Sequence, residues 1–533
     1  MTLSEEAYKA LEDTVGPEYV NREPAVLDGY CFVWGNELES EDKFSARPLA
    51  VILPGCTEEV QGIVRVANRF GLQYRAHATG FEVVALTAPH PILCVDMRRM
   101  NGLEIDEKNR IAVVEPYVSQ RRLQMELFRR GLRCNQLGAG PSASVMTGTA
   151  CHMGSGVSSI STEYGGRNLL GVEWVLPDGE ILKLGSLGSG AGWINGDGPG
   201  PSLRGALRGY GGANGGNGIF TKIATKVYPW YGPPEMKVIG EGPLYEMEVP
   251  ENYRVLAYGF AEGEDLVEFL HQFYEESIGF SLQLLPPAFY LILATKSNDE
   301  VYALYKSIPK EMIDALGIYG VLLSYDASSR GEMVYKDKVL QKIAEHTNAI
   351  PLPLDETATR VLYNETITAQ GTVKGAFRAC GTFIISPVGE ETWDSMVKMS
   401  RKSWEELMRP LEEEGSLLGG VAQEAMWGVP FGDGCGHVEM LSQWDPTDNK
   451  ANRAVAEMVR KGSERIAEWK LGINSLENAL SYNEGALKGA APYLRVDFIK
   501  YMKRIKKAFD PGNTSEPAWY VSPDETAYKV GKG

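Results

Sequence analysis

The feature that most constrains the fold of this 533-residue chain is the stretch of residues 136–182. Its first half consists almost entirely of small residues, which let the main chain approach a ligand closely and present N–H groups to an anion such as a pyrophosphate. Its second half is an apolar run, residues 169–176, followed by a Pro-Asp-Gly turn and by Ile181 and Leu182. This pattern predicts a buried strand that continues into a hairpin. We therefore expect a ligand-binding cradle that is supported by a β-hairpin.

A βαβ unit is expected upstream of the cradle. A helix is predicted from Thr57, which is followed by two glutamates and is a suitable N-cap. Apolar residues then recur at helical spacing until Gly71 ends the helix, and residues 72–76 return as a strand. The loop of residues 77–81 follows this strand and again contains small residues. It is a second candidate for contact with the ligand.

The rest of the chain divides by its composition. Further strands and one helix are predicted before the cradle, at residues 92–96, 100–106, 111–116 and 119–131. After it, a glycine cluster leads into the alternating pattern of residues 219–227, which predicts a strand. Glycine becomes rarer from about residue 233, where strands mix with longer helices. Residues 496–509 predict a basic amphipathic helix whose apolar positions suit packing on a core.

Composition excludes several classes of function. The net charge of −17 argues against a broad nucleic-acid surface, because such surfaces neutralise phosphates. The 7 cysteines include no C-x-x-C pair, so no metal or iron–sulfur site is expected within the chain, and a reducing compartment is favoured. No apolar run is long enough to cross a bilayer, and the first residues lack an apolar signal core. The cytoplasm is the expected location.

Several short motifs occur in an order that is typical of one family. They occupy residues 54–64, 94–101, 113–118, 164–180, 218–222 and 509–513. Together they resemble the vanillyl-alcohol oxidase/p-cresol methylhydroxylase family of FAD-dependent oxidoreductases, which includes glycolate- and D-lactate-oxidising members. The resemblance is strongest over residues 48–232 and in the tail after residue 496.

This resemblance implies an α+β fold and a non-covalently bound FAD. The expected parts are an N-terminal arm (1–46), a p-cresol methylhydroxylase-type FAD-binding domain of two α+β subdomains (47–232), an α+β cap or substrate domain (233–495), and a C-terminal segment that returns to the FAD-binding domain (496–533). Backbone groups between Pro141 and Gly156 are expected to hold the pyrophosphate. The full set of predicted FAD contacts is His77, Ala78, Thr79, Gly80, Phe81, Pro141, Ser142, Ala143, Ser144, Thr147, Gly148, Cys151, His152, Gly154, Ser155, Gly156, Ser158, Gly218, Ile219 and Phe220.

The resemblance and the residue chemistry also suggest catalytic candidates. His437 is the predicted base for a substrate hydroxyl, because an imidazole titrates near neutral pH. Arg167 and Lys470 are predicted to hold an anionic group such as a carboxylate, although Arg167 equally suits a pair with Glu163 or Glu173. Arg378 is a further candidate substrate contact, and Glu424, Asp433 and Glu439 are secondary candidates. No metal is expected.

The predicted function is oxidation of an alcohol or 2-hydroxy acid, with hydride transfer to flavin N5. The electrons would pass to oxygen or to a separate electron-transfer protein, iron–sulfur or otherwise, and a homo- or hetero-oligomer is expected. One alternative is a phenolic substrate of the 4-alkylphenol or vanillyl type. Another is a catalytically silent scaffold subunit of a redox complex, because the loop at residues 77–84 contains a single glycine where this family usually has several.

Overall fold

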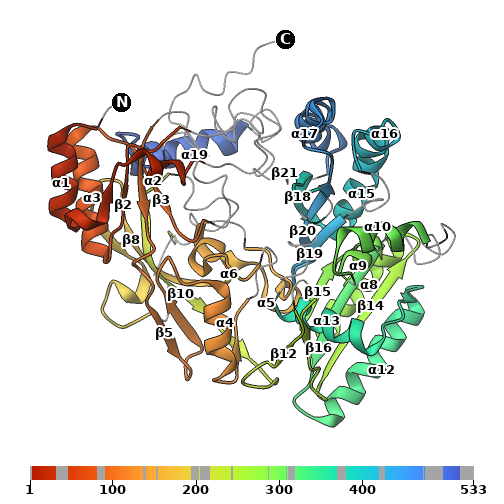
Figure 1. Ribbon diagram of the computed structural model, residues 1–533. Coiled ribbons are helices and arrows are strands. Elements are labelled where there is room, and N and C mark those ends of the chain that lie inside the picture. The colour runs from red at the N-terminus through yellow and green to blue at the C-terminus, as the bar shows by residue number, and fades with distance from the viewer. Residues whose placement is uncertain are drawn as a thin grey trace.

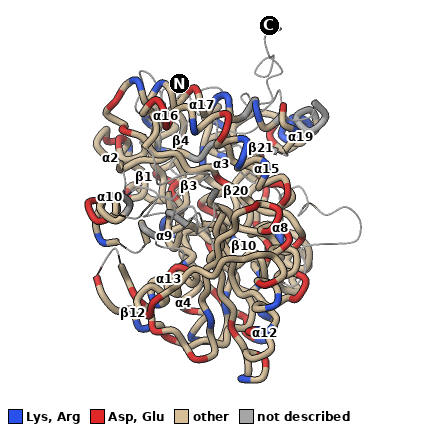
Figure 2. The backbone as a smooth tube through the Cα atoms, turned by 90° about the vertical axis from the view of Figure 1, so that its right-hand side faces the viewer, with Lys and Arg blue, Asp and Glu red and all other residues tan. Residues whose placement is uncertain are grey.

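The computed structural model forms two large parts that lie side by side, with the C-terminal helix returning across the first (Figure 1). None of its helices, over the part of the chain described, is long and apolar enough to cross a membrane. Acidic and basic residues are interspersed along the chain (Figure 2). The structure describes residues 3–31, 46–80, 91–135, 140–151, 154–193, 203, 216–241, 244–285, 287–293, 295–307, 309, 319–368, 378, 380–418, 426–471, 473–474 and 496–516.

The first sheet contains the predicted βαβ unit. Its strand order is β1 (Val20–Asn21), β2 (Ala50–Ile52), β4 (Leu93–Asp96) and β3 (Tyr74–His77), and β2 and β3 both run parallel to β4. Helices α1 (Glu5–Val15) and α3 (Thr57–Phe70) pack their apolar faces on this sheet. Gly71 ends α3 in the left-handed conformation, as predicted. Thr57 is the first helical residue rather than the N-cap, and its hydroxyl donates to Glu173 instead.

The second sheet is antiparallel and has five strands. Their order is β5 (Leu103–Asp106), β6 (Ile111–Val114), β10 (Ile219–Lys226), β8 (Leu169–Val175) and β9 (Ile181–Lys183). Strands β8 and β9 form the predicted hairpin. Glu173 on β8 fixes this sheet to the first, because its buried carboxylate accepts hydrogen bonds from Thr57 (2.7 Å) and Thr221 (3.0 Å).

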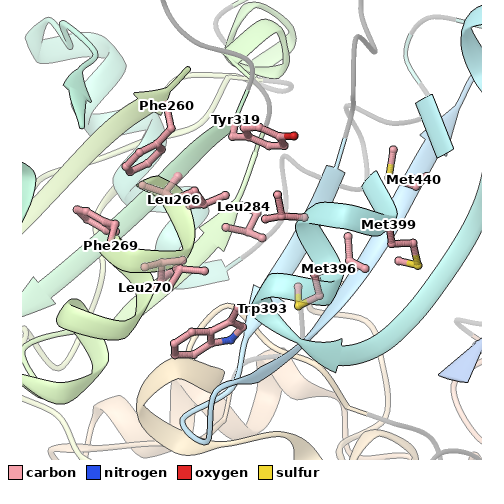
Figure 3. Close-up of a cluster of buried hydrophobic side chains, with 14 of the residues drawn as sticks. Phe260, Leu266, Phe269, Leu270, Leu284, Tyr319, Trp393, Met396, Met399 and Met440 are labelled. Atoms are coloured by element: carbon pink, nitrogen blue, oxygen red, sulfur yellow. The ribbon is translucent and has the colours of Figure 1, made fainter. Parts of the chain in front are cut away.

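The cap contains an eight-stranded antiparallel sheet. Its order is β17 (Ile350–Pro351), β14 (Tyr253–Phe260), β16 (Tyr319–Asp326), β15 (Ser281–Leu284), β19 (Met426–Pro430), β20 (Cys435–Ser442), β18 (Ile384–Thr392) and β21 (Ile473–Asn474). One face packs against α8 (Gly263–Glu275), α12 (Arg330–His346), α15 (Trp393–Ser403) and α17 (Asn449–Trp469). Phe269, Trp393 and Met396 belong to this core (Figure 3).

The opposite face of the cap sheet packs against a second cluster. That cluster includes side chains of α9 (Pro287–Leu293) and α13 (Glu356–Thr368) together with Trp427 and Val429 of β19. Because side chains alternate along a strand, each strand of the sheet contributes to both cores. On β20, Val438 and Met440 face the four-helix side, so His437 and Glu439 face the opposite side.

The C-terminal segment joins both sheets of the first part. In α19 (Val496–Phe509), the ring of Phe509 stacks on Trp174 with centroids 5.3 Å apart. The buried Lys506 ammonium donates to the carbonyl of Ser515 (2.5 Å) and to that of Gly216. Ser515 forms a parallel bridge with Tyr74 at the edge of the first sheet. The predicted return of the C-terminal segment is therefore confirmed, whereas the exact domain limits stay predictions.

Short elements complete the described chain. They are η1 (Pro17–Tyr19), α2 (Pro24–Asp28), α4 (Gln120–Phe128), β7 (Leu132–Arg133), η4 (Thr147–Cys151), α5 (Ser159–Thr162), α6 (Gly165–Asn168), η5 (Gly185–Leu187), β11 (Tyr228–Pro229), β12 (Val238–Ile239), β13 (Glu246–Met247), α10 (Asn298–Ser307), η7 (Trp404–Met408) and α16 (Arg409–Glu413).

Candidate functional site

The cradle is held together by direct contact between glycine backbones. Gly148 lies in η4, Gly154 has a positive φ of 63°, and Gly165 begins α6. The Gly165 N–H donates to the Gly154 carbonyl (2.9 Å). A Cβ atom on either Gly154 or Gly165 would overlap the Gly148 carbonyl. The small residues therefore allow three backbone segments to meet where any larger side chain would separate them.

The cradle is also anchored to the start of α4. The Ser144 hydroxyl donates to the Pro116 carbonyl (2.7 Å) and accepts from the Thr147 N–H (3.2 Å). The carbonyls of Pro141 and Ala143 accept from Arg121 and Gln120 in the first turn of the helix. These predicted contact residues thus fix the cradle, and Ser142 beside them is exposed.

Ser155 is the cradle side chain that lacks a partner. Its residue is 7% exposed, and its hydroxyl oxygen is buried with no hydrogen bond within the described residues. Leaving a buried hydroxyl unpaired is unfavourable, so a ligand atom is a natural partner for it. By contrast, the Ser158 hydroxyl lies 3.2 Å from that of Thr162, and Gly156 donates its N–H to Ser159. Ser155 is therefore a stronger candidate for a ligand contact than its neighbours.

Cys151, at the end of η4, is a buried thiol rather than a reactive thiolate. Burial raises the pKa of its thiol, and the nearby Glu516 carboxylate adds to that increase. His152, predicted beside it, lies outside the described residues, and so does Phe81.

The described part of the second predicted loop extends from His77 to Gly80. The His77 ring meets Tyr30 edge-on at 5.5 Å, and burial lowers the pKa of His77, so its imidazole is neutral near pH 7. Gly80 has a positive φ of 67°, and a Cβ there would overlap the His77 ring. Ala78 and Thr79 between them are half-buried. This loop therefore turns sharply at the end of β3.

The third predicted contact segment supports the cradle mainly through its backbone. Gly218 has a φ of 110°, lies against Val175 of β8, and donates its N–H to the Ser515 hydroxyl (2.9 Å). The side chains of Ile219 and Phe220 are 3% and 4% exposed in the two hydrophobic cores of this part. Because these side chains belong to the core, only the backbone of Ile219 and Phe220 is left for the predicted cofactor contact, which stays a prediction.

A charged group of three residues lies on the cap-sheet face opposite the four-helix core. Nδ1 of the fully buried His437 is hydrogen-bonded to Glu390 Oε1, and its Nε2 is hydrogen-bonded to Glu439 Oε1, both at 2.8 Å. The Trp427 ring lies edge-on to His437, with centroids 5.9 Å apart. We call Glu390, His437 and Glu439 the cap triad.

The protonation state of His437 bears on its predicted role. Burial alone would lower its pKa, but the hydrogen bonds and charges of Glu390 and Glu439 outweigh burial and raise it to about 10. An imidazolium whose two N–H groups are both engaged has no lone pair for a substrate proton. These contacts argue against His437 as the base, and its catalytic role stays a prediction.

Two of the other predicted catalytic cations, Arg167 and Arg378, make contacts elsewhere in the protein. Arg167 forms ion pairs with Glu163 (3.1 Å) and with Asp433. Arg378 donates from Nη1 to the carbonyls of Ile292 (2.5 Å) and Thr295 (2.7 Å).

Lys470 follows the end of α17 with a positive φ of 58° and is exposed. Among the described residues no contact brings Lys470 to Arg167 or to the triad. The two cations of the predicted anion-binding pair are thus not seen in contact with each other. Arg378 Nη1 binds backbone carbonyls, whereas its Nη2 is buried with no hydrogen bond within the described residues, so the predicted substrate contact of Arg378 stays a prediction.

Three contacts bring the cradle to the cap sheet. The Leu282 N–H on β15 donates to the Val157 carbonyl of the cradle (2.9 Å). The Ser161 hydroxyl donates to the Phe280 carbonyl (2.8 Å). The rings of Tyr164 and Phe431 lie 5.5 Å apart, and Phe431 directly follows β19.

Sequence reasoning missed Glu390 and Trp427. His437 and Glu439 are two residues apart, so a strand places them on one face, and this spacing was a usable signal. The register of β18 and β20 places Glu390 opposite His437. The register of β19 and β20 places Val429 opposite His437 on the other side. No local pattern reveals such pairings.

Comparison with known proteins agrees with the fold and the cradle. Residues 48–185 match the family model of an FAD binding domain. An uncharacterized FAD-linked oxidoreductase of Mycobacterium tuberculosis (strain CDC 1551 / Oshkosh) is 30% identical over 141 residues, which are 26% of this chain and 30% of that protein. Glycolate oxidase subunit GlcD of Escherichia coli (strain K12) is 28% identical over 205 residues, 38% and 39% of the two chains. The matched regions thus cover less than half of these relatives.

Two solved structures match nearly the whole chain. 4-Ethylphenol oxidase from Gulosibacter chungangensis has a TM-score of 0.75 and 20% identity, covering 97% of this chain and 98% of that one. p-Cresol methylhydroxylase has a TM-score of 0.73 and 15% identity, covering 96% and 95%. The chain therefore contains an FAD-binding domain within the fold of the p-cresol methylhydroxylase-type flavoproteins. The predicted resemblance, fold class and FAD cofactor are confirmed.

One observation in the cradle fits a bound cofactor such as FAD independently of the comparisons, namely the unpaired buried hydroxyl of Ser155. The residues that would hold the cofactor are thus those of the predicted cradle.

Proposed function

We propose that the protein is an FAD-dependent oxidoreductase that oxidises an alcohol-type substrate between the cradle and the cap triad. The observation that carries this proposal is the triad itself, in which two partly exposed carboxylates flank a fully buried imidazole, on a sheet that contacts the cradle. Buried charges are costly and are often retained for chemistry. The names of the relatives, oxidases and dehydrogenases of phenols, glycolate and lactate, support the same class of reaction.

Bound FAD would supply the acceptor for a hydride from the substrate C–H bond. The chain's own residues then have to remove the hydroxyl proton. Each triad carboxylate uses Oε1 for His437, and the Oε2 atoms of Glu390 and Glu439 make no hydrogen bond within the described structure. Either carboxylate is thus available to accept a proton, while His437 keeps both in place.

Glu439 is the better placed of the two carboxylates. It lies opposite Trp427 on β19. The indole Nε1 of Trp427 is 3.4 Å from Oε1 of Gln283 on β15. Strand β15 is the one that hydrogen-bonds to the cradle at Val157. Glu390 lies on β18, on the far side of β20 from β19, and we assign it to positioning His437.

The triad also bears on the substrate. Its two carboxylates and one imidazolium have a net charge of −1, which favours a neutral hydroxyl compound over an anion. Arg167, one of the two residues predicted to bind an anion, is already paired with Glu163 and Asp433. We therefore place a neutral alcohol first and a 2-hydroxy acid second. The electron acceptor, oxygen or a separate electron carrier, the oligomeric state and a cytoplasmic location stay part of the proposal.

The visible spectrum of the purified protein tests this proposal. We expect flavin absorbance that is released into solution on heat denaturation, as for a non-covalently bound cofactor. Anaerobic mixing with a panel of neutral alcohols, 4-alkylphenols and 2-hydroxy acids should bleach this absorbance, most rapidly with an alcohol. A folded protein that stays colourless after incubation with FAD would contradict the proposal and favour a scaffold role. A protein whose bound flavin no member of the panel reduces would contradict the assigned reaction.

A further inference from the structure

Arg167 joins the cradle to the cap through two carboxylates. It lies in α6, next to the glycine contact of the cradle, and pairs with Glu163 four residues before it (3.1 Å). Its second ion pair is with Asp433, in the loop of residues 431–434 that connects β19 to β20. One guanidinium therefore bridges two parts of the molecule that are far apart in sequence.

Neighbouring contacts hold the same junction. The Arg167 guanidinium lies 5.2 Å from the centroid of the Tyr164 ring, which in turn meets the Phe431 ring at 5.5 Å. Gly432 lies against the Glu163 carboxylate so closely that a Cβ there would overlap it. We call these contacts of residues 163–167 with residues 431–433 the cap latch.

The loop of the latch and the cap triad belong to one continuous stretch of chain. Its loop follows β19, which carries Trp427, and precedes β20, which carries His437 and Glu439. His437 is four residues from Asp433. A shift of the loop relative to the cradle therefore moves the triad relative to the cofactor site.

We propose that Arg167 is a positioning residue that sets the cap triad in register over the cofactor site, and that it does not bind the substrate. This inference rests on the proposed function for its catalytic consequence, but the latch itself is a property of the fold. Arg167 is 40% exposed and Asp433 29%, so an isolated pair there would contribute little. The second carboxylate and the ring contacts give the junction its geometry, and a displacement of about 1 Å from productive geometry costs on the order of 100-fold in rate.

Charge reversal tests the proposal. The variant R167E places a third carboxylate beside Glu163 and Asp433, and D433R places two cations together. The double variant R167E/D433R restores a pair of opposite charges. Arg401 provides the matched control R401E, because it is 39% exposed and also lies near two carboxylates, Glu262 and Glu264, both within the cap.

Two readouts separate the latch from the reaction. Hydrogen exchange of residues 431–436 reports on the latch without any substrate. We expect faster exchange in both single variants, and recovery in the double variant. The anaerobic rate of flavin reduction at saturating alcohol should fall roughly 10-fold in the single variants and recover in the double variant, with flavin content unchanged. R401E should match the unaltered protein in both measurements.

Each result has a distinct consequence. Unchanged exchange in R167E and D433R would overturn the latch. Faster exchange with an unchanged reduction rate would overturn its positioning role. A weaker apparent affinity for an anionic substrate in R167E, with no rescue by D433R, would overturn the proposal in favour of substrate binding. If no substrate of the panel reduces the flavin of the unaltered protein, the proposed function fails. The hydrogen-exchange measurement still decides whether the latch exists.

Discussion

The cradle and the cap triad are built in different ways. The cradle uses backbone atoms, and its defining contacts are among Gly148, Gly154 and Gly165, within 18 consecutive residues. The cap triad uses side-chain charges, and its members Glu390, His437 and Glu439 come from two strands of a sheet. A backbone cradle suits a cofactor shared by many relatives, whereas a side-chain group is easily changed. We therefore expect the cofactor in the cradle and the choice of substrate in the cap.

The largest expected effect is from filling the glycine contact. Gly154→Ala introduces a Cβ that overlaps the Gly148 carbonyl, so we expect loss of bound flavin, measured as the ratio of flavin to protein absorbance. Gly71→Ala is the matched control, because Gly71 has the same φ of 63° but no atom within 4 Å of the added Cβ. If both variants lose flavin equally, backbone strain and not the close contact governs the cradle.

The next effect is on the rate of reduction. Glu439→Gln removes the proposed proton acceptor while keeping its shape, so we expect the anaerobic reduction rate to fall on the order of 100-fold with flavin retained. Glu391→Gln serves as the control, since Glu391 is next to Glu390 on β18 and thus faces the other side of the strand. A rate for Glu439→Gln equal to that of the control would remove Glu439 from the reaction.

A smaller effect is expected at the unpaired cradle hydroxyl. Ser155→Ala removes a hydrogen bond to the cofactor, so the dissociation constant for FAD should rise roughly 10-fold, measured by fluorescence titration of the apoprotein. Ser142→Ala, at an exposed position of the same segment, should leave it unchanged. Equal affinities in the two variants would show that Ser155 does not contact FAD.

The last prediction concerns stability and not flavin binding. Because Glu390 and Glu439 raise the pKa of His437 to about 10, its imidazolium stabilises the folded state fully below pH 6.5, and this contribution is lost as the pH rises through 10. The free energy of unfolding should fall across this window by at most about 1.4 kcal/mol per pH unit. Denaturant titrations give the free energy of unfolding of the unaltered protein and of His437→Asn at each pH. The two free energies should diverge below pH 10, and parallel dependences on pH would show that His437 is neutral.

The elements themselves were largely predictable. Helix α3 and the hairpin of β8 and β9 follow from apolar spacing and turn residues, and α19 spans the predicted residues 496–509. The cradle was found because its signal, a run of small residues, is local. Thr57 shows the limit of such reasoning, because it has the features of a cap but gives its hydroxyl to Glu173, 116 residues away.

The predicted role of His437 is the one that its tertiary contacts argue against most directly, for a reason that the sequence did not reveal. An isolated histidine titrates near neutral pH, which is why it was predicted to act as a base. The register of β18 and β20 places Glu390 against it, and the strand period places Glu439 on the same face. Arg167 likewise gained Asp433, 266 positions along the chain, as a partner.

By itself, the sequence determined the secondary structure, the cradle and the FAD-binding class, because these depend on residues close together in the chain. Only the tertiary structure decided the protonation of His437, the engagement of Arg167 and the link between cradle and cap. The physical reason is that the properties of a charged group depend on which other charges lie within a few ångströms of it, and strand pairing and domain packing decide that.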